Sequence, residues 1–270
     1  MSTVASDPET GIIDVAGRRV NRWIHHGGDE AVVLVHGFGG DLESWRMNLD
    51  ALAATGMTVA ALDLPGHGHS SKSLETGALA ELMQAVLDYM DAEHIESAHL
   101  VGNSMGAAIC LSILAHRRQH VRSLTLVGPA GLGQPVDGTY IRSFIAASTS
   151  EQVEPVLRRL FADPGFVTPE MVERATNYKQ SAGVAAALTK IAMGGDSGAG
   201  ARSSGSLRAG LGVVPTLILW GGEDTIIPAP EPAAIARPGV AVHVLPGAGH
   251  MVQVERATAV NELIVDFLGS

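Results

Sequence analysis

The chain has 270 residues, of which 46% are hydrophobic and 17% charged, so it holds enough apolar side chains for the core of one large domain. A formal net charge of −10 argues against a nucleic-acid partner, whose phosphates such a surface would repel. The single cysteine, Cys110, excludes an internal disulfide. The first residues, MSTVASDPETG, lack the basic and apolar parts of a signal peptide, and no uncharged apolar run reaches the roughly 18 residues of a membrane span. We therefore expect a cytoplasmic protein without membrane contact.

Short apolar runs rich in β-branched residues predict six buried strands. They lie at residues 31–35, 58–62, 98–102, 121–127, 216–220 and 241–245. Helical periodicity occurs between most of these runs and after the last, at residues 45–54, 79–90, 105–115 and 254–268. This alternation predicts an α/β fold in which helices flank both faces of a mostly parallel central sheet.

The alternation breaks between about residues 131 and 212. Four segments there have helical periodicity and none has the pattern of a strand: 140–147, 152–161, 169–180 and 184–193. The chain then runs into GGDSGAGARSSGS at 194–206, a composition that predicts a mobile loop. We expect residues 132–206 to form a helical cap inserted into a core made of residues 1–131 and 207–270. A long decorated connection is the alternative.

The pattern G-x-S-x-G occurs as GNSMG at residues 102–106, between a predicted strand and a predicted helix. The chain must turn sharply from the strand into the helix, which would hold Ser104 in a strained conformation. Gly102 and Gly106 lack the Cβ atoms that would block a close backbone approach. The hydroxyl would project above the carboxyl edge of the sheet, where the helix N-terminus favours developing negative charge. Because the pattern also arises by chance in a chain with 32 glycines, its context is what makes Ser104 the predicted nucleophile.

A serine nucleophile needs a base that takes its proton, and the base needs an acceptor that fixes its tautomer. Among 11 histidines, His250 lies in the glycine-rich loop after the last predicted strand, where it can reach Ser104. Asp224 follows the preceding predicted strand in LWGGED, which gives the chain order serine, aspartate, histidine known from other hydrolases. We predict Asp224 as the acceptor, with its neighbour Glu223 as the competitor.

The negative charge that develops on a substrate carbonyl oxygen needs backbone donors. We predict the N–H of Met105, directly after the nucleophile, and that of Phe38 in HGFGG at residues 36–40. His36 is interpreted as bracing this loop rather than as a second base. His67 and His69 form H-x-H in DLPGHGHS, but no third ligand converges in the sequence, so bracing is favoured there too. Metal-ligand spacing, a phosphate-binding loop and a dinucleotide fingerprint are absent, and we expect neither metal nor cofactor.

Five segments stand in a fixed order along the chain: HGFGG, DLPGHGHS, GNSMG, WGGED and GAGH. Together they resemble the α/β-hydrolase superfamily over nearly the whole chain. HGFGGDLESW, ALDLPGHGHSSK, GPAGLG, LRRLFADPGFVTPEMVE and GAGHMVQVE further resemble the catalytic domain of dihydrolipoamide acetyltransferase components of acetoin dehydrogenase complexes. Members of that family carry an N-terminal lipoyl domain with a lipoylated lysine, whereas the segment before the first strand material here has no lysine. We therefore expect a free-standing hydrolase without the lipoyl carrier.

GNSMG also resembles the elbow of meta-cleavage C–C hydrolases, in which Asn often precedes the serine. Those enzymes tend to have Trp after the histidine, where this chain has Met251. This resemblance implies cleavage of a carbon–carbon bond next to a ketone.

The residues as a whole predict a serine hydrolase of the carboxylesterase type that cleaves a carboxylester or thioester through an acyl-enzyme. Hydrolysis of a C–C bond, acyl transfer to a thiol, and a non-catalytic receptor on the same scaffold are the alternatives. The small-molecule acyl substrate would lie between core and cap. Its predicted contacts are Gly37, Asn103, Phe144, Ile227 and Met251. A homodimer is compatible with the sequence.

Overall fold

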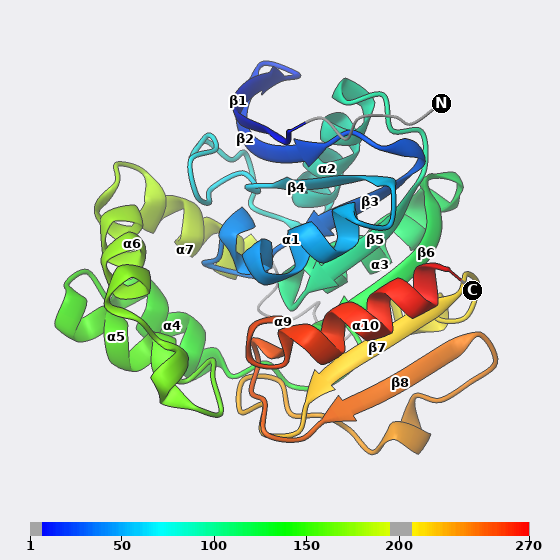
Figure 1. Ribbon diagram of the computed structural model, residues 1–270. Helices are drawn as coiled ribbons and strands as arrows, with labels where there is room; N and C mark the ends of the chain where they lie inside the picture. The colour runs from blue at the N-terminus through cyan, green and yellow to red at the C-terminus, as the bar shows by residue number, and fades with distance from the viewer. Residues whose placement is uncertain (1–6, 195–206, 270) are drawn as a thin grey trace.

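A computed structural model describes residues 7–194 and 207–269. Within them, eight strands form one sheet in the order β1-β2-β4-β3-β5-β6-β7-β8 (Figure 1). The strands are β1 (Glu9–Val15), β2 (Arg18–His25), β3 (Gly28–Val35), β4 (Met57–Leu62), β5 (Ala98–Asn103), β6 (Val121–Val127), β7 (Thr216–Gly221) and β8 (Val240–Leu245). Every neighbouring pair from β4 to β8 is parallel, and the six predicted strands are all confirmed.

The first two strands, β1 and β2, are absent from the sequence prediction. They form an antiparallel hairpin, and β2 also pairs antiparallel with β4. The two residues that connect them, Ala16 and Gly17, both have positive φ, of 51° and 78°, which is the geometry of a two-residue hairpin turn. Because many side chains of both strands remain exposed or half-buried, neither strand has the continuous apolar run that identifies the central strands.

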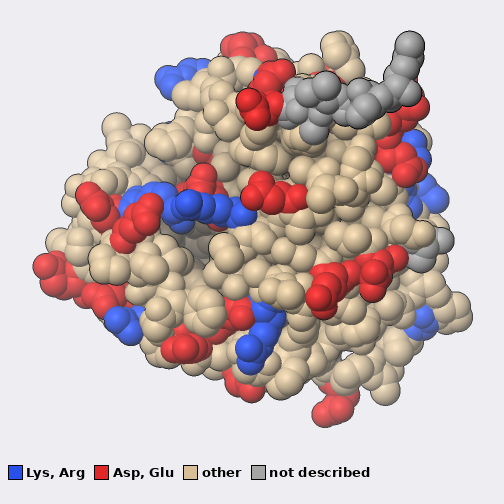
Figure 2. All heavy atoms as spheres, in the orientation of Figure 1, with Lys and Arg blue, Asp and Glu red and all other residues tan. Residues whose placement is uncertain are grey.

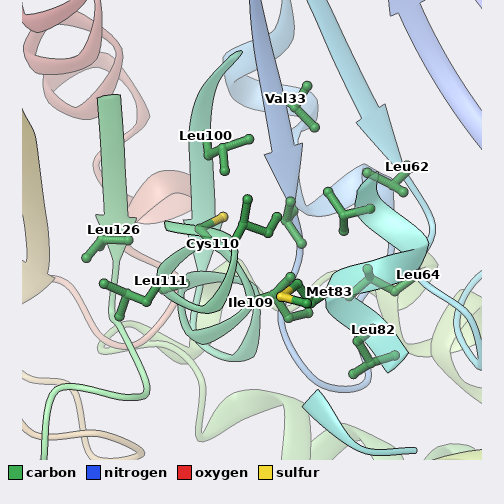
Figure 3. Close-up of a cluster of buried hydrophobic side chains, with 14 of the residues drawn as sticks. Val33, Leu62, Leu64, Leu82, Met83, Leu100, Ile109, Cys110, Leu111 and Leu126 are labelled. Atoms are coloured by element: carbon green, nitrogen blue, oxygen red, sulfur yellow. The ribbon is translucent and has the colours of Figure 1, made fainter. Parts of the chain in front are cut away.

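Helices cover both faces of the sheet. Successive side chains of β3 point to opposite faces of the sheet. Val32 and Leu34 pack in one hydrophobic cluster with α1 (Arg46–Ala53) and α10 (Ala257–Leu268). Val33 and Val35 point to the opposite face, which α2 (Leu79–Ala92) and α3 (Met105–His116) cover. Figure 3 shows part of this second cluster, with Met83 of α2 beside Ile109 of α3. The central strands of the sheet are therefore buried on both faces, as the sequence predicts.

A group of helices follows β6 and packs to one side of the sheet, on the left of Figure 1. It contains α4 (Gly138–Ala146), α5 (Ser150–Arg158), α6 (Pro169–Gln180) and α7 (Val184–Gly194). The side chains of Asp137 and Thr168 cap α4 and α6 by accepting from Thr139 N and Met171 N. The helices predicted between residues 132 and 194 are thus confirmed, whereas the predicted mobile loop lies almost wholly outside the described residues. That residues 132–206 form a cap on the core, and not a long decorated connection, remains a prediction.

The remaining short elements are η1 (Leu42–Trp45), η2 (Arg118–His120), η3 (Pro164–Phe166), η4 (Pro232–Ala234) and α9 (Val252–Glu255). Among the residues that the structure describes, no helix combines the length and apolarity that crossing a bilayer requires.

Candidate active site at the carboxyl edge of the sheet

Ser104 occupies the turn between β5 and α3 with φ 54° and ψ −115°, a conformation that L-residues rarely adopt. Its neighbours explain why the turn can be so tight. A Cβ on Gly106 would lie 2.1 Å from the Val35 carbonyl oxygen, and one on Gly102 would lie 2.6 Å from Ala107 N. The strained turn and the need for both glycines agree with the sequence prediction.

The carboxylate of Asp224 and the ring of His250 meet in the interior. Asp224 Oδ2 lies 2.7 Å from His250 Nδ1, and both side chains are buried. Asp224 Oδ1 accepts from Ile226 N and Ile227 N at 2.8 and 2.9 Å. Because an ionised carboxylate only accepts, the contact places the proton on Nδ1 and leaves Nε2 as an acceptor.

Glu223, the competitor for the same role, is engaged elsewhere. Its Oε2 accepts from Ala248 N at 3.0 Å, and its own N–H donates to Ala248 O at 2.9 Å. Glu223 thus joins the loop after β7 to the loop after β8, while Asp224 faces the imidazole.

Ser104 and His250 line one cavity of about 440 Å³. In the described part of the chain, neither the Ser104 hydroxyl nor His250 Nε2 has a hydrogen-bond partner. Hydrogen bonds between catalytic groups are often long before substrate binds, so a shared cavity is the relevant observation here. Ser104 also borders a second cavity of about 1000 Å³, which is lined by side chains from α2, α4 and α7.

The two predicted oxyanion donors belong to residues that line a cavity together with Ser104. Met105 is the first residue of α3, so its N–H has no partner within the helix. The N–H of Phe38 makes no backbone hydrogen bond within the described residues, and Phe38, Ser104 and Met105 all border the larger cavity. A Cβ on Gly37 would lie 3.1 Å from Ser104 Cβ, which shows how closely this loop approaches the serine.

His36 braces the same loop, as predicted. Its Nδ1 lies 2.8 Å from Gly37 O and its Nε2 accepts from Leu64 N at 3.0 Å. The contacts leave Nδ1 as the protonated nitrogen. Burial lowers the pKa of His36, which keeps the ring neutral in this role.

His67 is also fully buried. Its Nδ1 bonds to Pro65 O at 3.1 Å, and its ring stacks on Tyr178 of α6 with centroids 6.5 Å apart. Burial holds the pKa of His67 well below its ordinary value. Within residues 7–194 and 207–269, no group of three or more His, Cys, Asp or Glu side chains is placed to hold a metal ion.

Four of the five predicted substrate contacts line the smaller cavity. They are Gly37, Asn103, Phe144 and Met251. The fifth, Ile227, is not among the lining residues; its N–H donates to Asp224 Oδ1 and its carbonyl oxygen accepts from the Trp220 ring nitrogen. The preceding residue, Ile226, lines the cavity instead.

Charged side chains in the smaller cavity are absent from the sequence prediction. They are Asp41, Glu43, Arg46, Glu170 and Arg174. Arg174 Nε lies 3.4 Å from Asp41 Oδ2, and burial raises the pKa of Asp41 despite this partner. Figure 2 shows side chains of both signs gathered beside a hollow on this face. Because Asp41 directly follows HGFGG, the sequence could have predicted that it lines the cavity. Nothing in the sequence marks Arg174 as a cavity residue.

Known proteins resemble this chain along most of its length. A model of the alpha/beta hydrolase fold matches residues 30–257. The chain is 45% identical to the dihydrolipoyllysine-residue acetyltransferase component of the acetoin cleaving system of Pseudomonas putida, over 93% of this chain and 67% of that protein. It is 30% identical to 2-hydroxy-6-oxo-6-phenylhexa-2,4-dienoate hydrolase of Burkholderia cepacia, over 90% of this chain and 89% of that protein.

Among solved structures, a meta-cleavage product hydrolase from Pseudomonas fluorescens superposes with a TM-score of 0.85 at 24% identity, over 96% of this chain and 98% of that chain. This likeness shows the fold alone. The resemblances predicted from the motifs, to the superfamily and to the acetoin component, are thereby confirmed.

Proposed function

Because the chain belongs to the α/β hydrolase family, we propose that it is a serine hydrolase that cleaves a carboxylester or thioester through a covalent acyl-enzyme. The observation that carries the proposal is the 2.7 Å contact of Asp224 Oδ2 with His250 Nδ1 on a cavity that Ser104 also lines. A carboxylate that accepts from Nδ1 fixes the histidine tautomer in which Nε2 has no proton. Nε2 can then take the proton of the serine hydroxyl.

The reaction follows from these positions. Ser104 Oγ forms a bond to the substrate carbonyl carbon while His250 Nε2 takes the hydroxyl proton. The carbonyl electron pair moves to the oxygen, where the N–H groups of Phe38 and Met105 stabilise the charge. The pair then returns, the bond to the leaving oxygen or sulfur breaks, and His250 gives that atom the proton. Water repeats the sequence and releases the acid. Asp224 stays ionised throughout.

The two cavities suggest where the parts of the substrate lie. His250 lines the smaller cavity and is not among the residues that line the larger one. Since His250 must protonate the leaving group and later deprotonate water, both belong on the side of the smaller cavity. The acyl group then extends into the cavity of about 1000 Å³. Arg142 is the charged residue among its described lining side chains, which favours a large and mostly apolar acyl group.

Pre-steady-state kinetics with p-nitrophenyl esters test the proposal. We expect a burst of one p-nitrophenolate per active site, followed by slower turnover, because so activated an ester acylates Ser104 faster than water releases the acyl group. Ser104→Ala should abolish both phases. A wild-type protein without ester or thioester turnover, or a Ser104→Ala variant with the wild-type burst, would contradict the proposal.

Two other reactions have support of their own. The first is hydrolysis of a C–C bond: the relative from Burkholderia cepacia bears the name of a hydrolase of 2-hydroxy-6-oxo-6-phenylhexa-2,4-dienoate. The two arginines in the lining of the smaller cavity, Arg46 and Arg174, are cations that suit an acidic leaving fragment. Faster turnover of a vinylogous diketone than of any ester would favour this reaction. The relative from Pseudomonas putida bears the name of an acetyltransferase, so an added thiol that outcompetes water for the acyl-enzyme would favour acyl transfer.

A further inference from the structure

The loop that carries His250, residues 246–251 between β8 and α9, has backbone donors held on both sides of the histidine. Ala248 N donates to Glu223 Oε2 at 3.0 Å and Gly249 N donates to Glu255 Oε2 at 2.6 Å. Met251 N donates to Leu160 O at 3.1 Å. The position of the histidine along its loop is therefore set by partners that lie outside the loop.

Glu255 does more than satisfy Gly249. Its second oxygen, Oε1, accepts from Ala162 N at 2.8 Å and from Asp163 N at 3.0 Å. These two residues lie between α5 and η3, in the helical segment after β6. The carboxylate is buried and accepts three backbone N–H groups, and hydrogen bonds of this kind gain strength from its charge.

The two joined segments are in direct backbone contact. A Cβ on Gly249 would lie 2.7 Å from Ala162 N and 2.9 Å from Leu160 O, so no other residue fits between them. The loop that carries Asp224 has bonds to the same helical segment. Asp137 N donates to Ile226 O at 2.8 Å, and Thr225 Oγ1 lies 3.5 Å from Arg159 O.

We propose that Glu255 is a positioning residue for His250: it fixes Gly249 against residues 160–163 and thereby holds the imidazole where Nδ1 meets Asp224 Oδ2. This inference rests on the proposed function, because it takes His250 as the base. It adds that docking of the helical segment after β6 and alignment of the base depend on one carboxylate.

An amide at this position cannot reproduce the carboxylate. Glu255→Gln keeps the length of the side chain but replaces one accepting oxygen with an NH₂ group. Whichever way the amide turns, that group faces at least one of the three backbone N–H donors. Glu255→Asp keeps the charge and loses one methylene, so it cannot reach both segments at once.

The test compares Glu255→Gln and Glu255→Asp with Glu262→Gln, an exposed glutamate of α10 that undergoes the same change of charge. For each variant, kcat and KM on one p-nitrophenyl ester and the far-downfield ¹H NMR resonance of the His250 Nδ1 proton are measured. Loss of that resonance in Asp224→Asn assigns it. We expect kcat to fall about 10- to 100-fold in both Glu255 variants, with KM changed much less, and the resonance to shift or broaden. Glu262→Gln should match the wild type.

A purely structural role would lower the melting temperature of the Glu255 variants and leave kcat per folded molecule and the resonance unchanged, which would overturn the proposal. If Glu255→Gln does not fold, Glu255→Asp carries the comparison. The NMR measurement uses the resting protein. An altered resonance in a protein that hydrolyses no ester would therefore count against the proposed function alone.

Discussion

The two oxygens of the Asp224 carboxylate have different partners. Oδ1 accepts two backbone N–H groups, from Ile226 and Ile227, and Oδ2 meets His250 Nδ1. Because the backbone donors keep the carboxylate from rotating, the imidazole is oriented along with it. The sequence predicts this pair from the two loops that follow neighbouring strands, since the carboxyl ends of parallel strands meet at one edge. It favours Asp224 over Glu223 only through the turn expected at residues 225–228, since adjacent residues differ only in the direction that the turn gives each side chain.

Asp224→Asn should lower kcat by about 10⁴-fold while the protein stays folded. The amide oxygen will remain on Ile226 N and Ile227 N, so the NH₂ group will face His250 Nδ1. The ring must then accept at Nδ1 and carry its proton on Nε2, where it cannot take the proton of Ser104. Steady-state kinetics on an ester measure the loss. Glu223→Gln, which keeps an oxygen for Ala248 N, serves as the control and should remain nearly as active as the wild type.

The elements that carry the site differ in how well their sequences reveal them. The central strands β5 and β7 are predicted because they read as apolar runs bounded by turn residues. The edge strand β8 is predicted because its residues are mostly apolar, although several of them are exposed. The hairpin of β1 and β2 escapes prediction, because its partly exposed strands interrupt their apolar residues with charged ones. The helices α4 to α7 are predicted from their periodicity, but their arrangement depends on contacts between residues far apart in the chain. For the same reason the bonds of Glu255 could not be predicted.

At the start of α2, Glu81 accepts from the backbone N–H groups of Glu75, Thr76 and Gly77. Burial raises the pKa of Glu81, but these hydrogen bonds outweigh it and lower the pKa to about 2. A lowered pKa means that the ionised form stabilises the fold above the ordinary pKa of 4.5 and that this contribution is lost as the pH falls toward 2. Gly77 borders the larger cavity, so the loop held by Glu81 is part of its wall.

Glu81→Gln should therefore lower the free energy of unfolding at pH 7 by an amount on the order of 1 kcal/mol, because solvent screens this partly exposed carboxylate and the amide keeps one accepting oxygen. Urea unfolding of both proteins at a series of pH values measures the difference. The difference in the free energy of unfolding between the wild type and Glu81→Gln should begin to narrow below about pH 4.5. A difference that stays constant down to pH 3 would show that the carboxylate charge is not its cause.

On the scale of the whole molecule, Ser104 lies where two cavities meet. Both cavities are lined by the core and by the helices that follow β6. The motifs predict the serine, its partners and a substrate between the two layers. They do not predict that the space is divided or how large each part is. Phe38, Ile141 and Val136 line both cavities, and nothing local in the sequence signals that they do.

Substitutions on opposite sides of Ser104 should separate the two parts of the substrate. Ala192 of α7 lines the larger cavity and Ala175 of α6 lines the smaller one. Ala192→Phe should reduce kcat/KM about tenfold or more for octanoyl esters and leave acetyl esters nearly unaffected, because it removes space from the acyl side. Ala175→Phe should instead discriminate against bulky alcohols. The reverse pattern would place the acyl group in the smaller cavity.

The central claim is that Ser104 is the nucleophile, and covalent trapping tests it most directly. The protein is treated with a fluorophosphonate, digested, and analysed by mass spectrometry in parallel with Ser104→Ala. We predict one phosphonylated site, in the peptide that contains Ser104, and none in the variant. An unlabelled wild type, or equal labelling of Ser104→Ala, would contradict the assignment and the mechanism built on it.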